Sequence, residues 1–176
     1  MSKLTLFWWL MAPLFWSFST QGNAQFLDVG FSGELVHLSC KVSAGSVKKE
    51  IQLDELRMES LNLGEISPIT PFSIEIDHCQ RAELGKLIKM TWHGTQLANI
   101  DGDNYLITQG DSGVVLGIMD SEDKPIAWDE PIDVGSVAMV NDEQSLSFGV
   151  VARKPPYGYV STGQFSGWAT FSVEYK

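Results

Sequence analysis

The 176-residue sequence is poor in cysteine and in basic side chains. Its two cysteines allow at most one disulfide within the chain. Lys and Arg number 12 against 22 Asp and Glu, which gives a formal net charge of −10. Because nucleic-acid phosphates are neutralised by clustered basic side chains, this balance argues against nucleic acid as a partner. The 44% hydrophobic content is too high for a disordered polymer, and the length predicts one domain, or one domain with a processed segment.

Long apolar runs are also lacking, except near the N-terminus. Lys3 precedes an apolar run over residues 4–18, and the small residues 22–24 match the positions that signal peptidase recognises. We therefore expect a secretory signal in residues 1–24, with cleavage before Gln25. The apolar run of about 15 residues is shorter than the ~20 that cross a bilayer, and no later run is longer. The sequence predicts an exported product without stable membrane insertion.

The expected export of the chain predicts the oxidation state of its two cysteines. In an oxidising compartment Cys40 and Cys79 are expected to form one disulfide. It would close a loop of about 40 residues and stabilise the fold by roughly 4 kcal/mol in the chain-entropy model.

Alternation with a period of two dominates the rest of the chain. Phe72, Ile74 and Ile76 alternate with polar residues, and the pattern recurs over residues 88–92 and 146–150. Turn-forming clusters rich in Gly, Pro, Asp and Ser separate these segments, at residues 44–46, 101–104, 121–125 and 154–158. Short strands divided by turns predict an antiparallel sandwich or barrel. The best helical candidate, residues 54–63, would form at most a turn or two.

The alternation changes phase near residue 35. Val29, Phe31 and Leu35 are odd-numbered, whereas the apolar residues from Val36 to Val42 are even-numbered. A one-residue slip moves side chains to the opposite face of a strand. Either a bulge lies near residues 35–36, or the two halves pack against different cores.

The C-terminal segment is expected to form a strand that runs to the end of the chain. One face is apolar and the other is mostly polar. A terminal strand with an apolar face and an exposed hydrogen-bonding edge pairs readily with other chains unless something covers it. The small and apolar residues of the first face are Phe165, Gly167, Ala169, Phe171, Val173 and Tyr175.

Several segments together resemble the pilin subunits of chaperone-usher fimbriae. They are FSGEL at 31–35, CKV at 40–42, FSIEIDHC at 72–79 and LGIMD at 116–120, together with residues 163–175. In that family a glycine stands fourteenth from the C-terminus and an aromatic residue is penultimate, and these positions hold Gly163 and Tyr175. The resemblance covers essentially the whole chain after residue 24. Residues 85–95 are more similar to minor adaptor subunits of P-pilus-type tips than to the rod subunit.

The resemblance implies an all-β, incomplete immunoglobulin-like β-sandwich that lacks its final strand. Residues 36–176 would form the pilin domain, and residues 25–35 would be an N-terminal extension donated to a neighbouring subunit. In this donor strand Val29, Phe31 and Leu35 would plug the neighbour's core, and Gly33 would pass a shallow pocket. Such strand addition gives affinity through backbone hydrogen bonds and specificity through alternate side chains.

The resemblance also implies partners and a location. A periplasmic fimbrial chaperone would first supply the missing strand, an outer-membrane usher would assemble the fibre, and neighbouring pilins would then exchange strands. The subunit would be secreted through the periplasm to a fimbrium on the bacterial surface, as a minor adaptor supporting adhesion. The residues bordering the acceptor groove and the chaperone-binding edge would be Gly163, Phe165, Gly167, Ala169, Phe171, Val173 and Tyr175.

Candidate chemical sites are weak by comparison. Asp77, His78 and Cys79 resemble a nucleophile with its base, but adjacent strand residues point to opposite faces, and Cys79 has an oxidation partner. The acidic turn at 101–104 lacks the alternating ligands and distal Glu of a calcium loop. The three histidines lack metal-ligand spacing. We expect no enzymatic activity, no metal and no cofactor.

Three alternatives remain open from sequence. Within the same assembly system, the chain could be the major rod subunit or a terminating subunit that donates a strand without accepting one. In a different class, it could be a self-sufficient secreted β-sandwich that binds a small ligand or glycan. For Trp128 and Trp168, packing in the core or on a sheet face is expected rather than a binding role.

Overall fold

The computed structural model describes residues 40–53 and 56–176. Contacts divide the chain between Val36 and His37, and the described residues belong to the second unit, His37–Lys176. The predicted signal peptide and the donor-strand residues Val29, Phe31, Gly33 and Leu35 lie outside the described residues and stay predictions.

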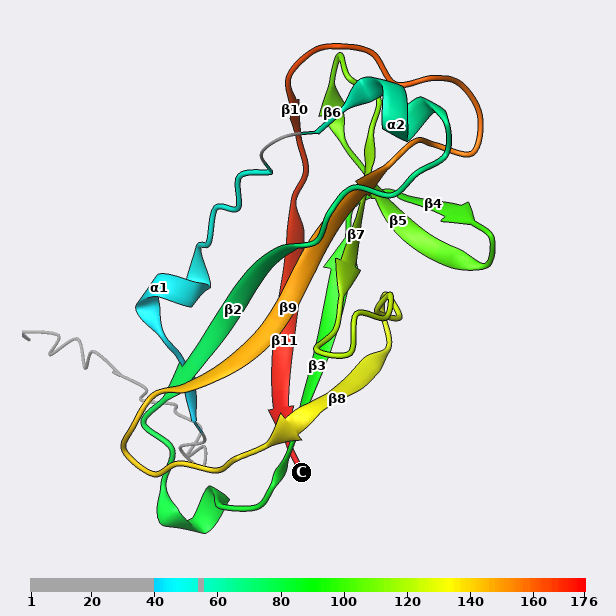
Figure 1. The fold of residues 1–176 in the computed structure, drawn as a ribbon. Helices are drawn as coiled ribbons and strands as arrows, with labels where there is room; N and C mark the ends of the chain where they lie inside the picture. Colours follow the sequence, from blue (N-terminus) through cyan, green and yellow to red (C-terminus); the bar gives the residue numbers. More distant parts are fainter. Residues whose placement is uncertain (1–39, 54–55) are drawn as a thin grey trace, which may run out of the picture. The chain divides into compact units, whose positions relative to one another are not determined.

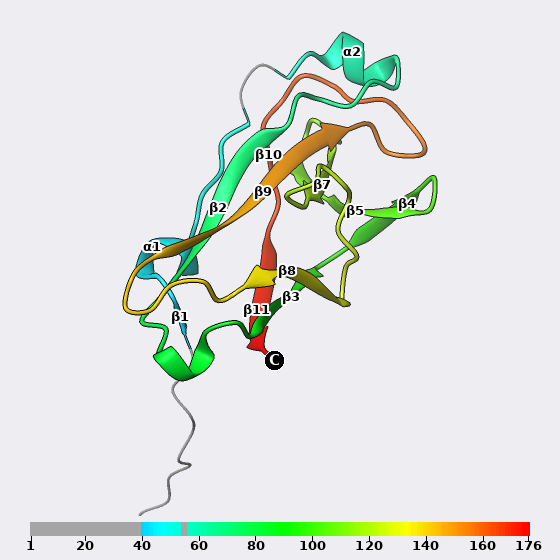
Figure 2. The ribbon, with the colours of Figure 1, turned by 60° about the horizontal axis from the view of Figure 1, so that its bottom comes forward.

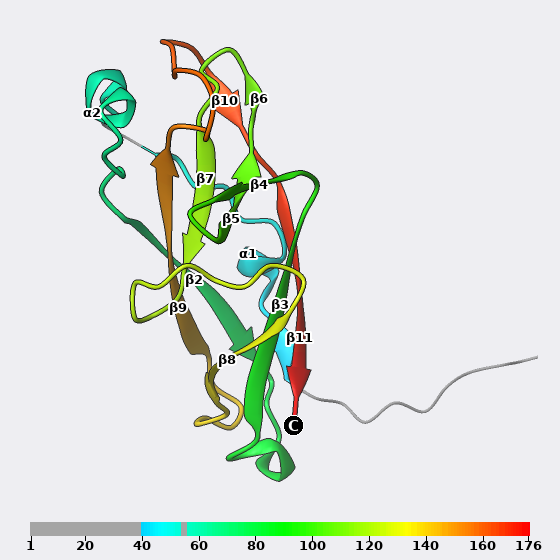
Figure 3. The same ribbon diagram turned by 90° about the vertical axis from the view of Figure 1, so that its right-hand side faces the viewer.

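Two antiparallel sheets form the framework (Figures 1 and 3). The larger sheet contains, in spatial order, β1 (Lys41–Val42), β2 (Thr70–Asp77), β9 (Gln144–Arg153), β7 (Val115–Met119), β5 (Asp103–Ile107) and β4 (Leu97–Ile100). The smaller sheet contains β11 (Ala169–Tyr175), β3 (Leu87–Gly94) and β8 (Pro131–Ser136). A two-stranded ribbon pairs β6 (Gln109–Gly110) with β10 (Phe165–Ser166).

The main core lies between the two sheets. The larger sheet contributes buried residues from β2 and β9, and the smaller sheet contributes alternate residues of β3. This placement follows from the period of two, since every second side chain of these strands points the same way. The buried residues from β2, β9 and β3 are Ile74, Ile76, Leu146, Phe148, Ile88, Met90 and Trp92.

The three strands predicted from alternation are confirmed as β2, β3 and β9. Helical structure is confined, among the described residues, to α1 (Ala44–Val47), α2 (Met58–Asn62) and the 3-10 turn η1 (Arg81–Glu83). α2 has five residues and falls within the helical candidate at 54–63, which agrees with the expectation of at most a turn or two. Residues 44–46, predicted to be a turn, lie in the one-turn helix α1.

The C-terminal segment differs from the prediction of one continuous strand. The structure breaks it at Gly167 and Trp168, giving β10 and β11. β10 pairs with β6, whereas β11 pairs with β3 of the smaller sheet. A Cβ at Gly167 would lie 3.0 Å from Leu106 Cδ2, so the chain passes close to β5 at the break. The segment changes partners there, and a change of partners leaves no trace in the alternation of a single strand.

Cys40 and Cys79 form the predicted disulfide. It ties the start of β1 to the loop after β2 at one end of the domain, which also contains η1 and the end of β11 (Figure 2). We call this end the root end. The opposite end, called the far end, contains α2 and the loop over residues 154–163 (Figure 1). No helix among the described residues is long and apolar enough to span a membrane.

Candidate functional site: an unpaired sheet edge

β11 is a seven-residue strand at the edge of the smaller sheet. Along one side it is paired with β3 in continuous register, from Ala169 opposite Gly94 to Tyr175 opposite Ile88. The backbone of Lys176 continues this pairing with two hydrogen bonds to Leu87, of 2.7 and 2.9 Å. Along its other side, β11 has no strand partner within the described part of the chain. Its outer N–H and C=O groups can therefore accept an added strand.

The inward face of β11 is apolar and only half-buried. Ala169, Phe171, Val173 and Tyr175 pack against the main core, yet each keeps intermediate exposure. Their neighbours on β3 are fully buried, with Ile88 and Met90 at 0% exposure. The side chains that β3 contributes to the core are thus shielded from solvent, whereas those of β11 are only partly shielded.

The edge of the larger sheet is also nearly free. β1 pairs with only the last two residues of β2, and the Ser43 N–H adds one bond to the Glu75 carbonyl. Over residues 70–74, β2 has no strand partner on that side among the described residues. Val42 and Phe72 are half-buried and pack on the same core as β11. We call the half-buried set the open apolar face: Val42, Phe72, Ala169, Phe171, Val173 and Tyr175.

Aromatic rings form the middle of this face. Trp92, which is 4% exposed, lies 5.1 Å from Phe171 and 6.1 Å from Phe72 between ring centroids. It also contacts Phe148 edge-on at 5.2 Å, so one indole joins both sheets. Aromatic pairs in this range are favourable beyond the area they bury. The rings give the open face a rigid centre.

A polar cluster fixes the chain that follows β1. The hydroxyls of Ser46 and Ser73 donate hydrogen bonds to the Glu75 carboxylate, and the Glu75 N–H donates to Ser46 Oγ at 2.9 Å. Lys49 Nζ bonds the Ser73 carbonyl at 2.7 Å and lies 3.4 Å from Glu75 Oε2. The bonds from Ser46 and Ser73, with the charge of Lys49, lower the pKa of Glu75 to about 2. The cluster attaches α1 to β2 beside the nearly free edge.

At the root end, the open apolar face ends at Tyr175. Burial, together with the nearby negative charges of Glu83 and Asp77, raises the pKa of the Tyr175 hydroxyl to about 12. Asp77 lies opposite Lys41 in β1, so Tyr175 and the start of the domain lie at the same end. Glu83 is fully buried and pairs with Lys86 at 2.9 Å. The penultimate tyrosine is thus neutral at physiological pH.

The other outer strands are better protected against pairing. β8 starts at Pro131, carries Asp133, and has a register shift opposite Ile88 and Lys89. β4 has only four residues. Short strands, prolines, charges and bulges are the usual means of blocking edge association. β11 is longer, and its exposed residues are mainly Thr, Ser and Glu on the outer face. It is the edge best suited to accept a strand.

The sequence motifs with possible chemistry do not form a reactive site. Cys79 is in the disulfide, and His78 Nδ1 lies 2.7 Å from Asp77 Oδ1 on the surface. The acidic turn joins β4 to β5, where Asp101 and Gly102 have φ of 58° and 103°. Within residues 40–53 and 56–176, no group of three or more His, Cys, Asp or Glu could hold a metal.

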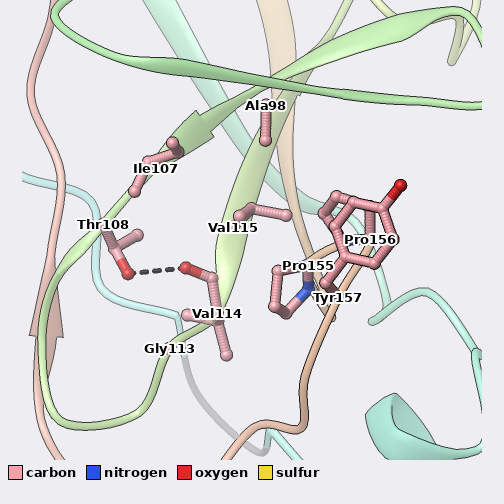
Figure 4. Close-up of a pocket in the computed structure, with 9 residues that line it drawn as sticks. All are labelled: Ala98, Ile107, Thr108, Gly113, Val114, Val115, Pro155, Pro156 and Tyr157. Carbon is pink, nitrogen blue, oxygen red and sulfur yellow. Dashed lines mark hydrogen bonds between the residues drawn. The ribbon is translucent and has the colours of Figure 1, made fainter.

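A small apolar cavity of about 280 Å³ lies at the far end (Figure 4). Its lining carries no carboxylate, imidazole, thiol or amine, and the Thr108 hydroxyl is bonded to the Val114 carbonyl at 2.6 Å. The lining residues are Ala98, Ile107, Thr108, Gly113, Val114, Val115, Pro155, Pro156 and Tyr157. The cavity therefore suits an apolar contact.

Trp128 and Trp168 lie in different environments. Trp128 is 6% exposed in the core, as expected, and donates from Nε1 to the Asn104 carbonyl at 2.8 Å. Trp168 is 62% exposed at the break between β10 and β11, so the expectation of packing is wrong for this residue. Alternation alone could not show that the strand is interrupted there.

Comparisons with known proteins agree with this architecture. The family model described as "Fimbrial protein" matches residues 29–176. KS71A fimbrillin of Escherichia coli is 24% identical over 159 residues, covering 85% of this chain and 84% of the relative. The fimbrial adapter PapK of Escherichia coli is 29% identical over 172 residues, covering 94% and 97%. The chain belongs to the fimbrial protein family.

A solved structure supports the fold assignment. The P pilus rod subunit PapA superposes with a TM-score of 0.64 at 21% identity, covering 79% of this chain and all of PapA. The predicted all-β pilin fold is confirmed.

The predicted groove residues are distributed over three parts of the structure. Ala169, Phe171, Val173 and Tyr175 lie together on the open apolar face. Phe165 instead packs with the small far-end cluster of Leu61, Val114 and Val160. Gly167 lies at the break against β5, and Gly163 lies close to Asp111, where a Cβ would approach Asp111 Cβ to 3.0 Å. The sequence could not identify Val42, Phe72 and Trp92 as neighbours of β11, because that requires knowing which strands face each other.

Proposed function

We propose that this chain is a structural subunit of a chaperone-usher fimbrium, completed by a strand from a neighbouring subunit, and that it has no catalytic role. One observation carries the proposal: the seven-residue edge strand β11 has no strand partner on its outer side within residues 40–53 and 56–176, and it lies above a half-buried apolar face. Donated backbone groups would pair with this edge, and donated side chains would cover the open apolar face. The chain would be exported through the periplasm and displayed on the bacterial surface.

The proposed donor is the N-terminal extension of the next subunit, residues 25–35 in this chain. The donor segment has eleven residues, which is long enough to pair along the whole seven-residue strand β11. In an extended donor strand, Val29, Phe31 and Leu35 would lie on one face. Burying each would stabilise the joint by roughly 1.5 to 3 kcal/mol. Gly33 would pass the aromatic centre formed by Phe72, Trp92 and Phe171.

Residues 1–24 are proposed to be the signal peptide, and residues 36–176 the pilin domain. Before assembly, a periplasmic chaperone would occupy the edge formed by β11, and an outer-membrane usher would guide exchange for the neighbour's extension. The set proposed to border the acceptor groove comprises Gly163, Phe165, Gly167, Ala169, Phe171, Val173 and Tyr175.

Within the fibre we propose a minor adaptor position. PapK, described as a fimbrial adapter, is 29% identical over 94% of this chain, whereas KS71A fimbrillin is 24% identical over 85%. The adaptor-like segment over residues 85–95 contains the whole of β3, the strand that pairs with β11. Deleting the gene should then shorten or reduce tips while leaving the rod, as seen by electron microscopy of the fimbriae. Loss of the rod itself would assign the major subunit role instead.

The central test is strand complementation. The mature chain, residues 25–176 with its disulfide formed, should aggregate or unfold non-cooperatively when purified alone. A synthetic peptide of residues 25–35 should give a soluble domain with one cooperative melting transition. Fluorescence of Trp92 should change on peptide binding, because its indole lies beside Phe171 under the filled face. A stable, cooperative monomer that ignores the peptide would show a self-sufficient binding module instead.

A charged substitution in the donor peptide tests whether Phe31 is a plug residue. A Phe31→Asp peptide should bind at least tenfold more weakly, because a carboxylate would be buried in an apolar face. A Ser32→Asp peptide is the matched control, since adjacent residues of a strand point to opposite faces. Equal loss for both peptides would reject the proposed register while leaving strand addition intact.

A further inference from the structure

The far end displays the three most exposed large hydrophobic side chains of the described residues. Tyr157 is 90% exposed, Leu63 is 82% exposed and Tyr159 is 81% exposed. They come from two segments, the turn after α2 and the loop after β9 (Figure 1). We call Leu63, Tyr157 and Tyr159 the apical patch. Tyrosine is enriched at the centres of protein interfaces, where its ring and hydroxyl both find partners.

The apical patch is held in place from below. The Asn62 amide donates to the Val160 carbonyl at 3.0 Å, and the Val160 N–H donates back to Asn62 Oδ1 at 2.9 Å. Ser161 Oγ adds a bond of 2.6 Å to the Asp111 carbonyl. Beneath the patch, Leu61, Val114 and Val160 form a small buried cluster. A surface that is already ordered loses little conformational entropy when a partner binds.

The root end also exposes apolar side chains. Leu84, Leu87 and Met139 are 46%, 48% and 45% exposed. Backbone bonds place all three segments at this end: Gly85 N–H donates to the Val137 carbonyl, and Asn141 N–H donates to the Cys79 carbonyl. The domain therefore presents apolar groups at both ends.

The length of chain between the donor segment and the domain limits how far apart two subunits can lie. Only residues 36–39 separate Leu35, the last proposed plug, from Cys40. Even fully extended, this connection spans about 17 Å. Cys40 is fixed to the root end by its disulfide with Cys79. The root end of the donating subunit must therefore lie close to the point where Leu35 leaves the accepting domain.

Because the same contact must repeat along a fibre, only one end of the accepting domain can be the place where the donor's Leu35 leaves it. If the donor's Leu35 left the accepting domain at that domain's root end, the root ends of the two subunits would meet. The acceptor's own extension also starts at its root end, so it would need the same space to reach the next neighbour. If it leaves at the far end, each domain uses different ends for its two neighbours. Only the second arrangement is a head-to-tail contact that repeats in an open fibre.

We propose that the apical patch binds the root end of the pilin subunit that donates its extension to this chain. The donor's counterparts of Leu84, Leu87 and Met139 would pack against Tyr157, Tyr159 and Leu63, beside the uncharged cavity shown in Figure 4. The contact extends the joint beyond the donated strand and orients consecutive subunits. It rests on the proposed function, because the short connection matters only if residues 25–35 fill a neighbour.

The first test is a photo-crosslinking map in fimbriated cells. A photoreactive benzoylphenylalanine at position 159 should form an adduct with the donor subunit, and mass spectrometry should place it on the donor's counterpart of residues 81–87 or 139–141. Position 47 is the matched control, since Val47 is 64% exposed but lies on α1 outside the patch. Adducts at another surface of the neighbour, or none with a pilin, would overturn the proposal.

A second measurement separates this contact from strand addition. The Tyr157→Ser, Tyr159→Ser double variant should be incorporated into fimbriae about tenfold less, as expected for the loss of an interface hot spot, while binding the 25–35 peptide normally. Val47→Ser should leave both readouts unchanged. Normal incorporation of the double variant would reject the apical contact alone. Failure of the unsubstituted chain to bind the peptide would instead reject the proposed function.

Discussion

Glu75 illustrates how a single residue fixes the segment that lies beside the edge of the larger sheet. Its carboxylate accepts bonds from Ser46 and Ser73 and pairs with Lys49, so α1 is attached to β2. The same cluster bonds the backbone N–H of Glu75 and the carbonyl of Ser73. The sequence predicted that residue 75 alternates outward from the core, and it does. It could not predict the cluster, because Ser46 lies 29 residues away and side-chain partners depend on the tertiary fold.

The lowered pKa of Glu75 predicts an acid-sensitive contribution to stability. The folded-state pKa is about 2, below the ordinary value of 4.5, so the contribution is complete above pH 4.5 and is lost as pH falls toward 2. In the peptide-filled domain, Glu75→Gln should lower the free energy of unfolding at pH 7 by about 1 kcal/mol, allowing for solvent screening. Urea unfolding at pH 7, 4.5 and 2.5 measures the difference.

The variant and the unsubstituted domain should converge as the pH falls. Glu122→Gln is a suitable control, because Glu122 pairs with Lys124 on the surface with both side chains about 70% exposed. It should have almost no effect. A Glu75→Gln difference that stays constant between pH 7 and 2.5 would contradict the assigned pKa.

At the scale of elements, the break between β10 and β11 divides the C-terminal segment into two roles. β10 pairs with β6, whereas β11 pairs with β3 and has no second strand partner in the described part of the chain. Alternation predicted the strand character of both halves correctly. It could not predict the change of partner, since alternation reports which face is buried and not which strand lies alongside. The exposure of Trp168 is a consequence of the same break.

Gly110 is the residue in β6 that permits the ribbon with β10. Its φ is +112°, and a Cβ there would lie 2.2 Å from the Gln164 carbonyl oxygen. Gly110→Ala should therefore destabilise the peptide-filled domain by about 2 kcal/mol or more. It should also speed hydrogen exchange at the amides of Phe165 and Ser166. Thermal unfolding and exchange measured by NMR test both effects.

Gly102→Ala separates backbone strain from steric overlap. Gly102 has a similar φ of +103°, but a Cβ at this position would have no heavy atom within 4 Å. Its substitution should cost about 1 kcal/mol and leave exchange in β10 unchanged. Equal effects of the two substitutions would show that close contact with Gln164 is unimportant.

At the scale of the whole molecule, the β-sandwich has a buried main core between its two sheets and a half-buried open apolar face beside it. The sequence predicted the all-β class, the disulfide and the apolar C-terminal strand, because each leaves a local pattern. It left open whether the phase change near residue 35 was a bulge, and residues 25–35 lie outside the described part. The juxtaposition of Phe72, Trp92 and Phe171 needed the fold, since it joins three strands from two sheets.

The disulfide should contribute strongly to the stability of the domain. Cys40 and Cys79 are 39 positions apart, and closing such a loop stabilises the fold by roughly 4 kcal/mol in the chain-entropy model. The Cys40→Ser, Cys79→Ser double variant, filled with peptide, should unfold at correspondingly lower urea concentration. The reduced unsubstituted domain is the control and should match it. A change below about 1 kcal/mol in both would show that the unfolded chain is already constrained.

The same cross-link determines how a fibre would bear tension. In the proposed assembly, a pull along the fibre enters each domain at Cys40, through the extension held by its neighbour. The disulfide passes part of this load directly to Cys79, bypassing β1, α1, α2 and β2. The bypassed segment would otherwise lengthen by about 130 Å on unravelling. The cross-link therefore prevents residues 41–78 from unravelling when the joint is under tension.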